Sequence, residues 1–206
     1  MSNREAIIFD FDGTLTQFRK IDNEIIETIF KGHKVMLFID SFLWIINGLG
    51  IIGNSMLGLK IRLYLYALFS FKTTKRYINV LVRYEEMYIA LSSNIKEETL
   101  NSLRKIKEKY KVVIISNNFF AKGIVVDGIK VDYAYKKKKL FKEERNKNDV
   151  AYIVGDNLFD DYMNSKNTPF IYVGNSFIVR FIIRLNPFKR NVVRIKKISD
   201  IEDVVL

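Results

Sequence analysis

The chain has 206 residues, enough for one compact domain or for a core domain that carries a smaller inserted one. It contains no cysteine, which excludes disulfide bonds, thiolate metal sites and cysteine nucleophiles. Its 34 Lys and Arg outnumber its 23 Asp and Glu, and the net charge of +11 favours anionic partners such as phosphorylated metabolites, anionic lipid surfaces or nucleic acid. The first residues show no secretory signal pattern, so we expect a cytoplasmic location.

Short apolar runs predict the buried strands of a parallel sheet. They lie at residues 6–9, 112–116, 151–154 and 169–173. A helix is expected before the second run, beginning at Asn94 with Glu97 placed as in a capping box. Leu100, Leu103 and Ile106 form the apolar stripe of this helix. Strands that alternate with helices indicate an α/β doubly wound, Rossmann-like core.

Polar residues follow three of these runs. Asp10, Ser116 and Asp156 each come just after the last apolar residue of an expected strand. In open parallel sheets, ligands bind at the carboxyl ends of the strands. We therefore expect these three side chains to converge on one edge of the sheet and to outline an active site.

The first two runs are separated by roughly eighty residues, whereas an ordinary connection has about 2 to 6. Residues 25–88 are rich in Leu, Ile, Phe and Tyr and are predicted to be mostly helical. We interpret residues 18–93 as an inserted helical cap domain. Residues 1–17 and 94–206 then form the core domain.

The segment FDFDGTLT at residues 9–16 carries two carboxylates, Asp10 and Asp12, beside Gly13. A carboxylate nucleophile that forms an acyl phosphate splits one difficult displacement into two easier ones. A second carboxylate two positions on can protonate the leaving oxygen and then deprotonate the attacking water. Gly13 permits a tight turn that brings both carboxyls together. The segment resembles the first signature of the haloacid dehalogenase (HAD) superfamily, DxDGT with apolar flanks.

Two later segments resemble further signatures of this superfamily. Ser116 ends an apolar strand, as in the second signature, and its hydroxyl is expected to hold phosphoryl oxygens with the backbone amides of Asn117 and Asn118. Thr14 is also assigned to phosphate binding. The segment VGDNLFDD at residues 154–161 resembles the fourth signature, GDxxxD.

The resemblance implies a Mg²⁺ site, and magnesium prefers oxygen ligands in octahedral geometry. The expected protein ligands are Asp10, the main-chain carbonyl of Asp12, and Asp156. Asp160 is expected to support the site without ligating the metal, and Asp161 is the alternative for that role.

The third signature is a lysine that neutralises charge between the nucleophile and the phosphate. Residues 136–139 are all lysine, so this position is ambiguous. The family's lysine opens a helix whose first apolar residues follow about one turn later. Leu140 and Phe141 therefore favour Lys137, with Lys138 next and Lys142 as a further alternative.

The likeness covers residues 4–17 and 94–175 and implies a magnesium-dependent phosphatase, a phosphomonoesterase that acts through an aspartyl phosphate on Asp10. A phosphotransferase uses the same intermediate and stays an alternative. An insertion between the first and second signatures is the C1 type of cap. The first signature followed by a helical cap resembles the subgroup that contains phosphoserine phosphatase.

The cap resembles that of members similar to phosphatidylglycerophosphatase C, which act on a lipid phosphate. Residues 41–59 carry no charge but contain four glycines, so two helices with a turn near residues 48–54 are expected rather than a bilayer span. Basic residues beside apolar ones at 60–76 and 177–185 suit an anionic lipid surface. A cap packed on itself, with its basic residues in solvent, explains them equally well.

We therefore expect a phosphatase for a phosphorylated lipid or lipid-linked head group, peripheral at the inner membrane face. A soluble metabolite, such as phosphoserine or a sugar phosphate, is the alternative substrate. A basic nucleic-acid-binding module is a distant alternative. Tyr133 and Tyr135 lie beside the lysine run, but the sequence contains no recognised nucleic-acid motif, so no nucleic-acid partner is expected.

Overall fold

The computed structural model describes residues 4–29, 64, 74–134, 137–157, 161–162, 165, 167–176, 179, 181 and 192–206. The strands are β1 (Ala6–Asp10), β2 (Lys111–Ser116), β3 (Val125–Val126), β4 (Ile129–Tyr133), β5 (Val150–Gly155), β6 (Phe170–Val173) and β7 (Val192–Ile195). The helices are α1 (Phe18–Ile29), α4 (Thr74–Ser92), α5 (Glu97–Lys109), α6 (Lys137–Lys147) and α9 (Glu202–Val205), with short 3₁₀ turns at Phe119–Ala121 and Ile198–Ile201.

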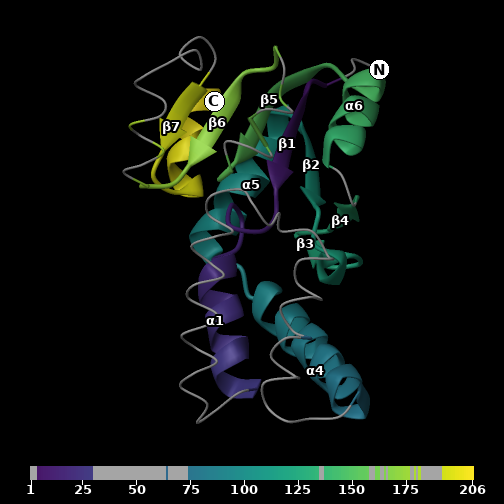
Figure 1. The fold of residues 1–206 in the computed structure, drawn as a ribbon. Coiled ribbons are helices and arrows are strands. Elements are labelled where there is room, and N and C mark those ends of the chain that lie inside the picture. The colour runs from purple at the N-terminus through teal and green to yellow at the C-terminus, as the bar shows by residue number, and fades with distance from the viewer. Residues whose placement is uncertain are drawn as a thin grey trace.

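The strands form one sheet in the order β3-β4-β2-β1-β5-β6-β7 (Figure 1). Every pairing is parallel except that of β3 with β4. β1 lies in the middle, where Ile8 pairs with Val113 of β2 and with Ile153 of β5. The predicted α/β class with a doubly wound parallel sheet is confirmed.

The residues of β1 alternate between two apolar layers, because successive side chains of a strand point to opposite faces. Ile7 and Phe9 pack in one layer with Leu103 of α5, and this layer also contains the C-terminal residues around Ile201. Ile8 packs in the other layer with Phe141 of α6. Helices therefore cover both faces of the sheet, and β1 is fully buried between them.

Helix α5 begins three residues later than the sequence predicts. Its first residue is Glu97 and its N-cap is Lys96, whose side chain makes no capping hydrogen bond, so the predicted capping box of Asn94 and Glu97 is wrong. Ile95 is buried in the core, which holds the chain extended up to Lys96. Glu97 and Glu98 in the first turn are favourable at the positive end of the helix dipole. The predicted apolar stripe is present, with Leu103 fully buried.

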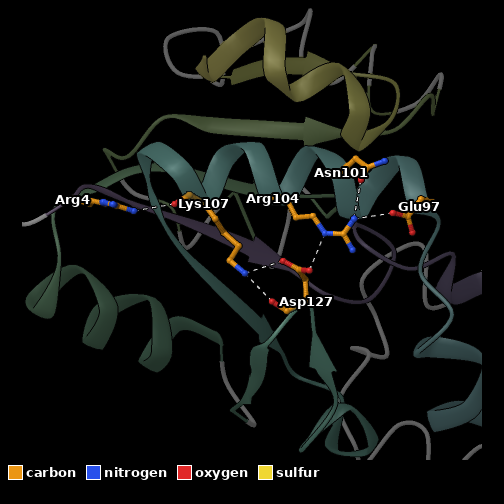
Figure 2. A network of polar contacts seen from close by, with 6 residues as sticks. All are labelled: Arg4, Glu97, Asn101, Arg104, Lys107 and Asp127. Carbon is orange, nitrogen blue, oxygen red and sulfur yellow. Dashed lines mark hydrogen bonds and ion pairs between the residues drawn. The ribbon is translucent and has the colours of Figure 1, made fainter.

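The hairpin of β3 and β4, which the sequence analysis did not predict, turns at Asp127 and Gly128. Both have positive φ angles, 47° and 78°, as the two central residues of a type I′ turn require. The Asp127 carboxylate lies 3.0 Å from Nε of Arg104 and 2.8 Å from Nζ of Lys107, both on α5 (Figure 2). These hydrogen bonds to Lys107 and Arg104 lower the pKa of Asp127. The network fastens the hairpin to α5.

Helices α1 and α4 are the described parts of the segment between β1 and β2. They pack against each other and extend away from the sheet (Figure 1). Between them, the buried Tyr84 hydroxyl of α4 donates a hydrogen bond to the buried Asp22 carboxylate of α1. The uncharged stretch at 41–59, most of the basic segment at 60–76 and all but two residues of 177–185 lie outside the described residues. The cap boundaries at 18–93 therefore stay a prediction.

None of the helices in the described part of the chain is long and apolar enough to cross a bilayer.

Candidate active site

The side chains predicted to form the site lie where parallel strands end. Asp10 is the last residue of β1, Ser116 is the last residue of β2, and Asp156 follows β5 directly. Asp10 and Ser116 are buried, with 2% and 0% of their surfaces exposed. β1 lies between β2 and β5, so the three residues come together at the carboxyl edge of the sheet's centre.

Three carboxylates and one lysine form a buried cluster at this edge. Asp10, Asp156 and Asp161 each offer a carboxylate oxygen, and these oxygens lie within 4.8 Å of one another. Nζ of Lys137 lies 2.8 Å from Oδ1 of Asp10 and 2.8 Å from Oδ1 of Asp161. Only 4% of the Lys137 surface is exposed. One lysine cannot balance three carboxylates, so the cluster has an excess of negative charge.

Burial and the neighbouring charges together shift the pKa values of these carboxyls. Burial raises the pKa of Asp10 well above its usual value and the charge of Asp161 raises it further, while Lys137 opposes both. Burial, followed by the charge of Asp161, raises the pKa of Asp156 to about 7. A hard divalent cation among these oxygens would remove the repulsion. The donor set of the cluster therefore fits Mg²⁺.

Two glycines allow the carboxylates to approach the backbone. A Cβ on Gly13 would lie 2.1 Å from Oδ2 of Asp156, and φ of Gly13 is +84°. A Cβ on Gly155 would lie 2.3 Å from Oδ2 of Asp161. Any other residue at either position would displace a carboxylate of the cluster, which explains why glycine stands in both motifs.

The Asp12 carboxylate is held at both of its oxygens. Oδ2 accepts a hydrogen bond of 2.7 Å from the Ser116 hydroxyl, and Oδ1 accepts one of 2.5 Å from the Tyr88 hydroxyl. The Ser116 oxygen in turn accepts the backbone N–H of Asn118 at 2.9 Å. Burial raises the pKa of Asp12, while the hydrogen bonds from Tyr88 and Ser116 oppose this rise.

The sequence left two positions ambiguous: the lysine of the third signature, and the supporting carboxylate at Asp160 or Asp161. Lys137 is the first residue of α6 and contacts Asp10, whereas Lys138 is exposed. Asp160, the predicted supporting residue, lies outside the described residues. Asp161, the alternative for that role, is fully buried and paired with Lys137.

The predicted phosphate-binding residues lie close to these groups in the chain. Thr14 is buried, and its Oγ1 has no hydrogen-bond partner among the described residues. Asn117 is partly buried and follows Ser116. Their roles toward a phosphate stay predictions.

Sequence reasoning missed Tyr88, whose hydroxyl contacts Asp12. Tyr84 and Tyr88 are one helical turn apart, which is a common spacing of core residues. That spacing did not indicate which of the many aromatic residues in the insertion reaches the site.

A cavity of about 820 Å³ opens over the site. Asp12, Gly13 and Asp156 form one wall. Among the described residues, the other wall is formed along α1 and by the residue before it: Gln17, Phe18, Arg19, Lys20, Asn23, Glu24 and Glu27. The site is therefore open to a molecule that approaches past α1, and most of the described lining is polar or charged.

The chain has the fold of HAD-like hydrolases. It is similar to a haloacid dehalogenase-like hydrolase from Burkholderia xenovorans LB400, with 15% identity, a TM-score of 0.66 and coverage of 98% of this chain and 97% of that one. It is also similar to the HAD-hydrolase YfnB from Bacillus subtilis, solved bound to magnesium, with 13% identity, a TM-score of 0.67 and 99% of both chains covered. A third similar structure, L-2-haloacid dehalogenase from Xanthobacter autotrophicus with chloropropionic acid covalently bound, has 14% identity, a TM-score of 0.62 and 98% of both chains covered. No protein-family model matches the sequence, and no curated protein matches it significantly.

Proposed function

We propose that this chain is a magnesium-dependent phosphatase of the HAD superfamily that cleaves phosphomonoesters through an aspartyl phosphate on Asp10. The observation that carries the proposal is that two carboxylates at the end of β1 lie in different surroundings. Asp10 lies 2.8 Å from the Lys137 ammonium. Asp12, two residues on, is held by neutral hydroxyl donors instead. One carboxylate thus lies beside a cation that attracts phosphate, and the other is placed to exchange a proton.

In the first step, an oxygen of the Asp10 carboxylate attacks the phosphorus, and the bond between phosphorus and the ester oxygen breaks. Asp12 donates its proton to that leaving oxygen, which departs as an alcohol. Lys137 offsets the negative charge that the phosphoryl group brings next to Asp10. The product of this step is the free alcohol and a phosphorylated Asp10.

In the second step, a water molecule attacks the phosphorus of the aspartyl phosphate. Asp12 takes a proton from this water, and the bond between phosphorus and the Asp10 oxygen breaks. Inorganic phosphate leaves, the Asp10 carboxylate is restored and Asp12 is again protonated.

The residues that would hold Mg²⁺ are Asp10, the main-chain carbonyl of Asp12, and Asp156. When bound, the ion supplies positive charge that offsets the repulsion between the carboxylates and an incoming phosphate. Asp161 shares Lys137 with Asp10, with each carboxylate 2.8 Å from its Nζ. We therefore assign to Asp161 the supporting role of keeping Lys137 beside the nucleophile.

A dehalogenase reaction is the other chemistry found among proteins of this fold. A halide leaves without a proton, so that reaction does not need a proton donor beside the nucleophile. The presence and fixed orientation of Asp12 therefore favour the phosphatase.

For the substrate we propose a phosphomonoester with a polar group next to the phosphate, either a lipid head group or a soluble metabolite. The support is the described lining of the cavity, which contains the basic Arg19 and Lys20 as well as the acidic Glu24 and Glu27. Phosphate release from a lipid phosphate dispersed in detergent can be compared with release from a water-soluble ester that has the same head group. This comparison distinguishes the two sources of the substrate.

The test of the proposed function is phosphate release from a panel of soluble and lipid phosphomonoesters, with Mg²⁺ or with EDTA, by wild type and Asp10→Asn. We expect release that requires Mg²⁺ and that falls at least about 10²-fold in the variant, because an amide cannot form the acyl phosphate. Release that persists with Asn at position 10 and with EDTA would contradict the mechanism. A panel that includes 2-chloropropionate, with chloride release measured, tests the dehalogenase reaction in parallel.

A further inference from the structure

We propose that Tyr88 is a positioning residue that orients the Asp12 carboxylate for proton transfer to the leaving group. The inference rests on the proposed phosphatase function and extends it to a residue of the inserted segment. Tyr88 belongs to α4, which precedes β2 in the chain, and not to one of the three strands that end at the site. Its hydroxyl donates a hydrogen bond of 2.5 Å to Oδ1 of Asp12.

The two donors to Asp12 come from different parts of the fold. Ser116, at the end of β2, donates to Oδ2 at 2.7 Å. The Ser116 oxygen accepts the N–H of Asn118, which leaves its hydroxyl hydrogen directed at Asp12. Tyr88 binds the other oxygen from α4. Hydroxyl donors on both oxygens restrict rotation of the carboxylate plane, and loss of the Tyr88 hydroxyl would remove the donor to Oδ1.

The Tyr88 hydroxyl is held in place by packing. The side chain is fully buried, and its ring lies 6.1 Å from that of Phe18 and 6.3 Å from that of Phe120. Phe18 begins α1, and Phe120 follows β2 in a short 3₁₀ turn. Because rings from two other segments confine Tyr88, its hydroxyl has little freedom to leave Asp12 while α4 stays in place.

This contact links the inserted segment to the chemistry. Asp12 lines the cavity together with the first turns of α1, and α1 packs against α4. A movement of α4 away from the sheet would remove one of the two donors from Asp12. The segment that contacts the substrate would then also control when the proton donor is correctly oriented.

The test is Tyr88→Phe, which keeps the buried ring and removes only the hydroxyl. Its kcat/KM is measured with p-nitrophenyl phosphate and with the alkyl phosphate that wild type cleaves fastest. p-Nitrophenolate leaves without taking up a proton, whereas an alkoxide must be protonated to leave as an alcohol. The value of kcat/KM reports only the steps up to the release of the leaving group, so it isolates the step in which Asp12 acts as an acid. We expect a fall of about 10- to 100-fold for the alkyl phosphate and of less than about 3-fold for p-nitrophenyl phosphate.

Tyr84→Phe is the matched control, because Tyr84 lies one turn earlier on α4 and its hydroxyl contacts Asp22 instead of Asp12. We expect this variant to lower kcat/KM for both substrates by the same factor, if at all. An equal fall for both substrates in Tyr88→Phe, or no fall in either, would overturn the positioning role while the phosphatase function stands. If wild type cleaves neither ester, the proposed function fails, and the role of Tyr88 fails with it.

Discussion

The Lys137 ammonium determines whether two buried carboxylates can stay charged together. It lies 2.8 Å from Asp10 and 2.8 Å from Asp161, and all three side chains are almost fully buried. A buried ion pair adds little stability compared with apolar residues of the same size. Removing one partner, however, leaves the other charge buried without compensation, which is strongly destabilising. We therefore expect Lys137 to stabilise the site, in addition to its proposed role of attracting phosphate.

Replacing Lys137 by Met should lower the free energy of unfolding by about 3–5 kcal/mol without Mg²⁺, because buried carboxylates lose their cation. Urea unfolding in EDTA measures this effect. The matched control is Lys138→Met, which removes the same charge from the exposed neighbour on α6 and should change the stability by no more than about 0.5 kcal/mol. If both variants lose the same stability, the pairing of Lys137 with the carboxylates contributes nothing.

The convergence of Asp10, Ser116 and Asp156 could be predicted from the sequence. Each follows an apolar run typical of a buried parallel strand, and such strands share one carboxyl edge. The contact of Tyr88 with Asp12 could not, because it depends on how α4 packs against the sheet. The sequence favoured Asp160, which fits the spacing of GDxxxD, over Asp161. The spacing of a motif does not show which of two adjacent side chains reaches the lysine.

At the scale of whole elements, the sequence indicated the central strands but not the edges of the sheet. The four predicted strands are continuous apolar runs in the middle of the sheet. β7 at one edge contains Arg194 and is only partly buried, so no clear pattern marked it. The β3–β4 hairpin carried a recognisable sequence signal, Asp127-Gly128 between apolar residues, although no strand was predicted there.

The attachment of this hairpin to α5 should depend on pH. Hydrogen bonds from Lys107 and Arg104 lower the pKa of Asp127 below its usual value of 3.8. A carboxyl whose pKa is lowered by folding stabilises the folded state above its unfolded pKa, and this contribution is lost as the pH falls through the folded pKa. The contribution of Asp127 is therefore present at neutral pH and is lost below about pH 4.

Asp127→Asn keeps a residue that tolerates the positive φ but removes the charge. We expect a lower urea midpoint than wild type at pH 7, and a difference that shrinks as the pH falls below about 4. Glu97→Gln, which removes another carboxylate partner of Arg104 but leaves the hairpin untouched, is the control. A difference between wild type and Asp127→Asn that stays constant from pH 7 to the acid limit of folding would contradict the electrostatic role.

For the molecule as a whole, Mg²⁺ should raise the resistance to heat, because an ion that binds only the folded state stabilises it. At about 100 times the dissociation constant the gain is about 2.7 kcal/mol, which corresponds to roughly 5–10 °C in Tm for a chain of this size. Asp156→Asn should reduce this shift strongly, whereas Asp132→Asn, at an exposed position, should keep it. An equal shift in both variants would place the ion elsewhere.

The position of β1 in the sheet has a consequence for how the chain folds during its synthesis. Ala6 pairs with Lys111 on one side and with Val150 on the other, so the strand that ends at Asp10 has no partner until more than half of these residues have been made. Contacts between residues so distant in sequence form slowly, because a long loop must close first. An apolar strand completed early must therefore stay unpaired through translation of the entire insertion. Chaperone dependence and aggregation of the nascent chain are expected to originate at β1.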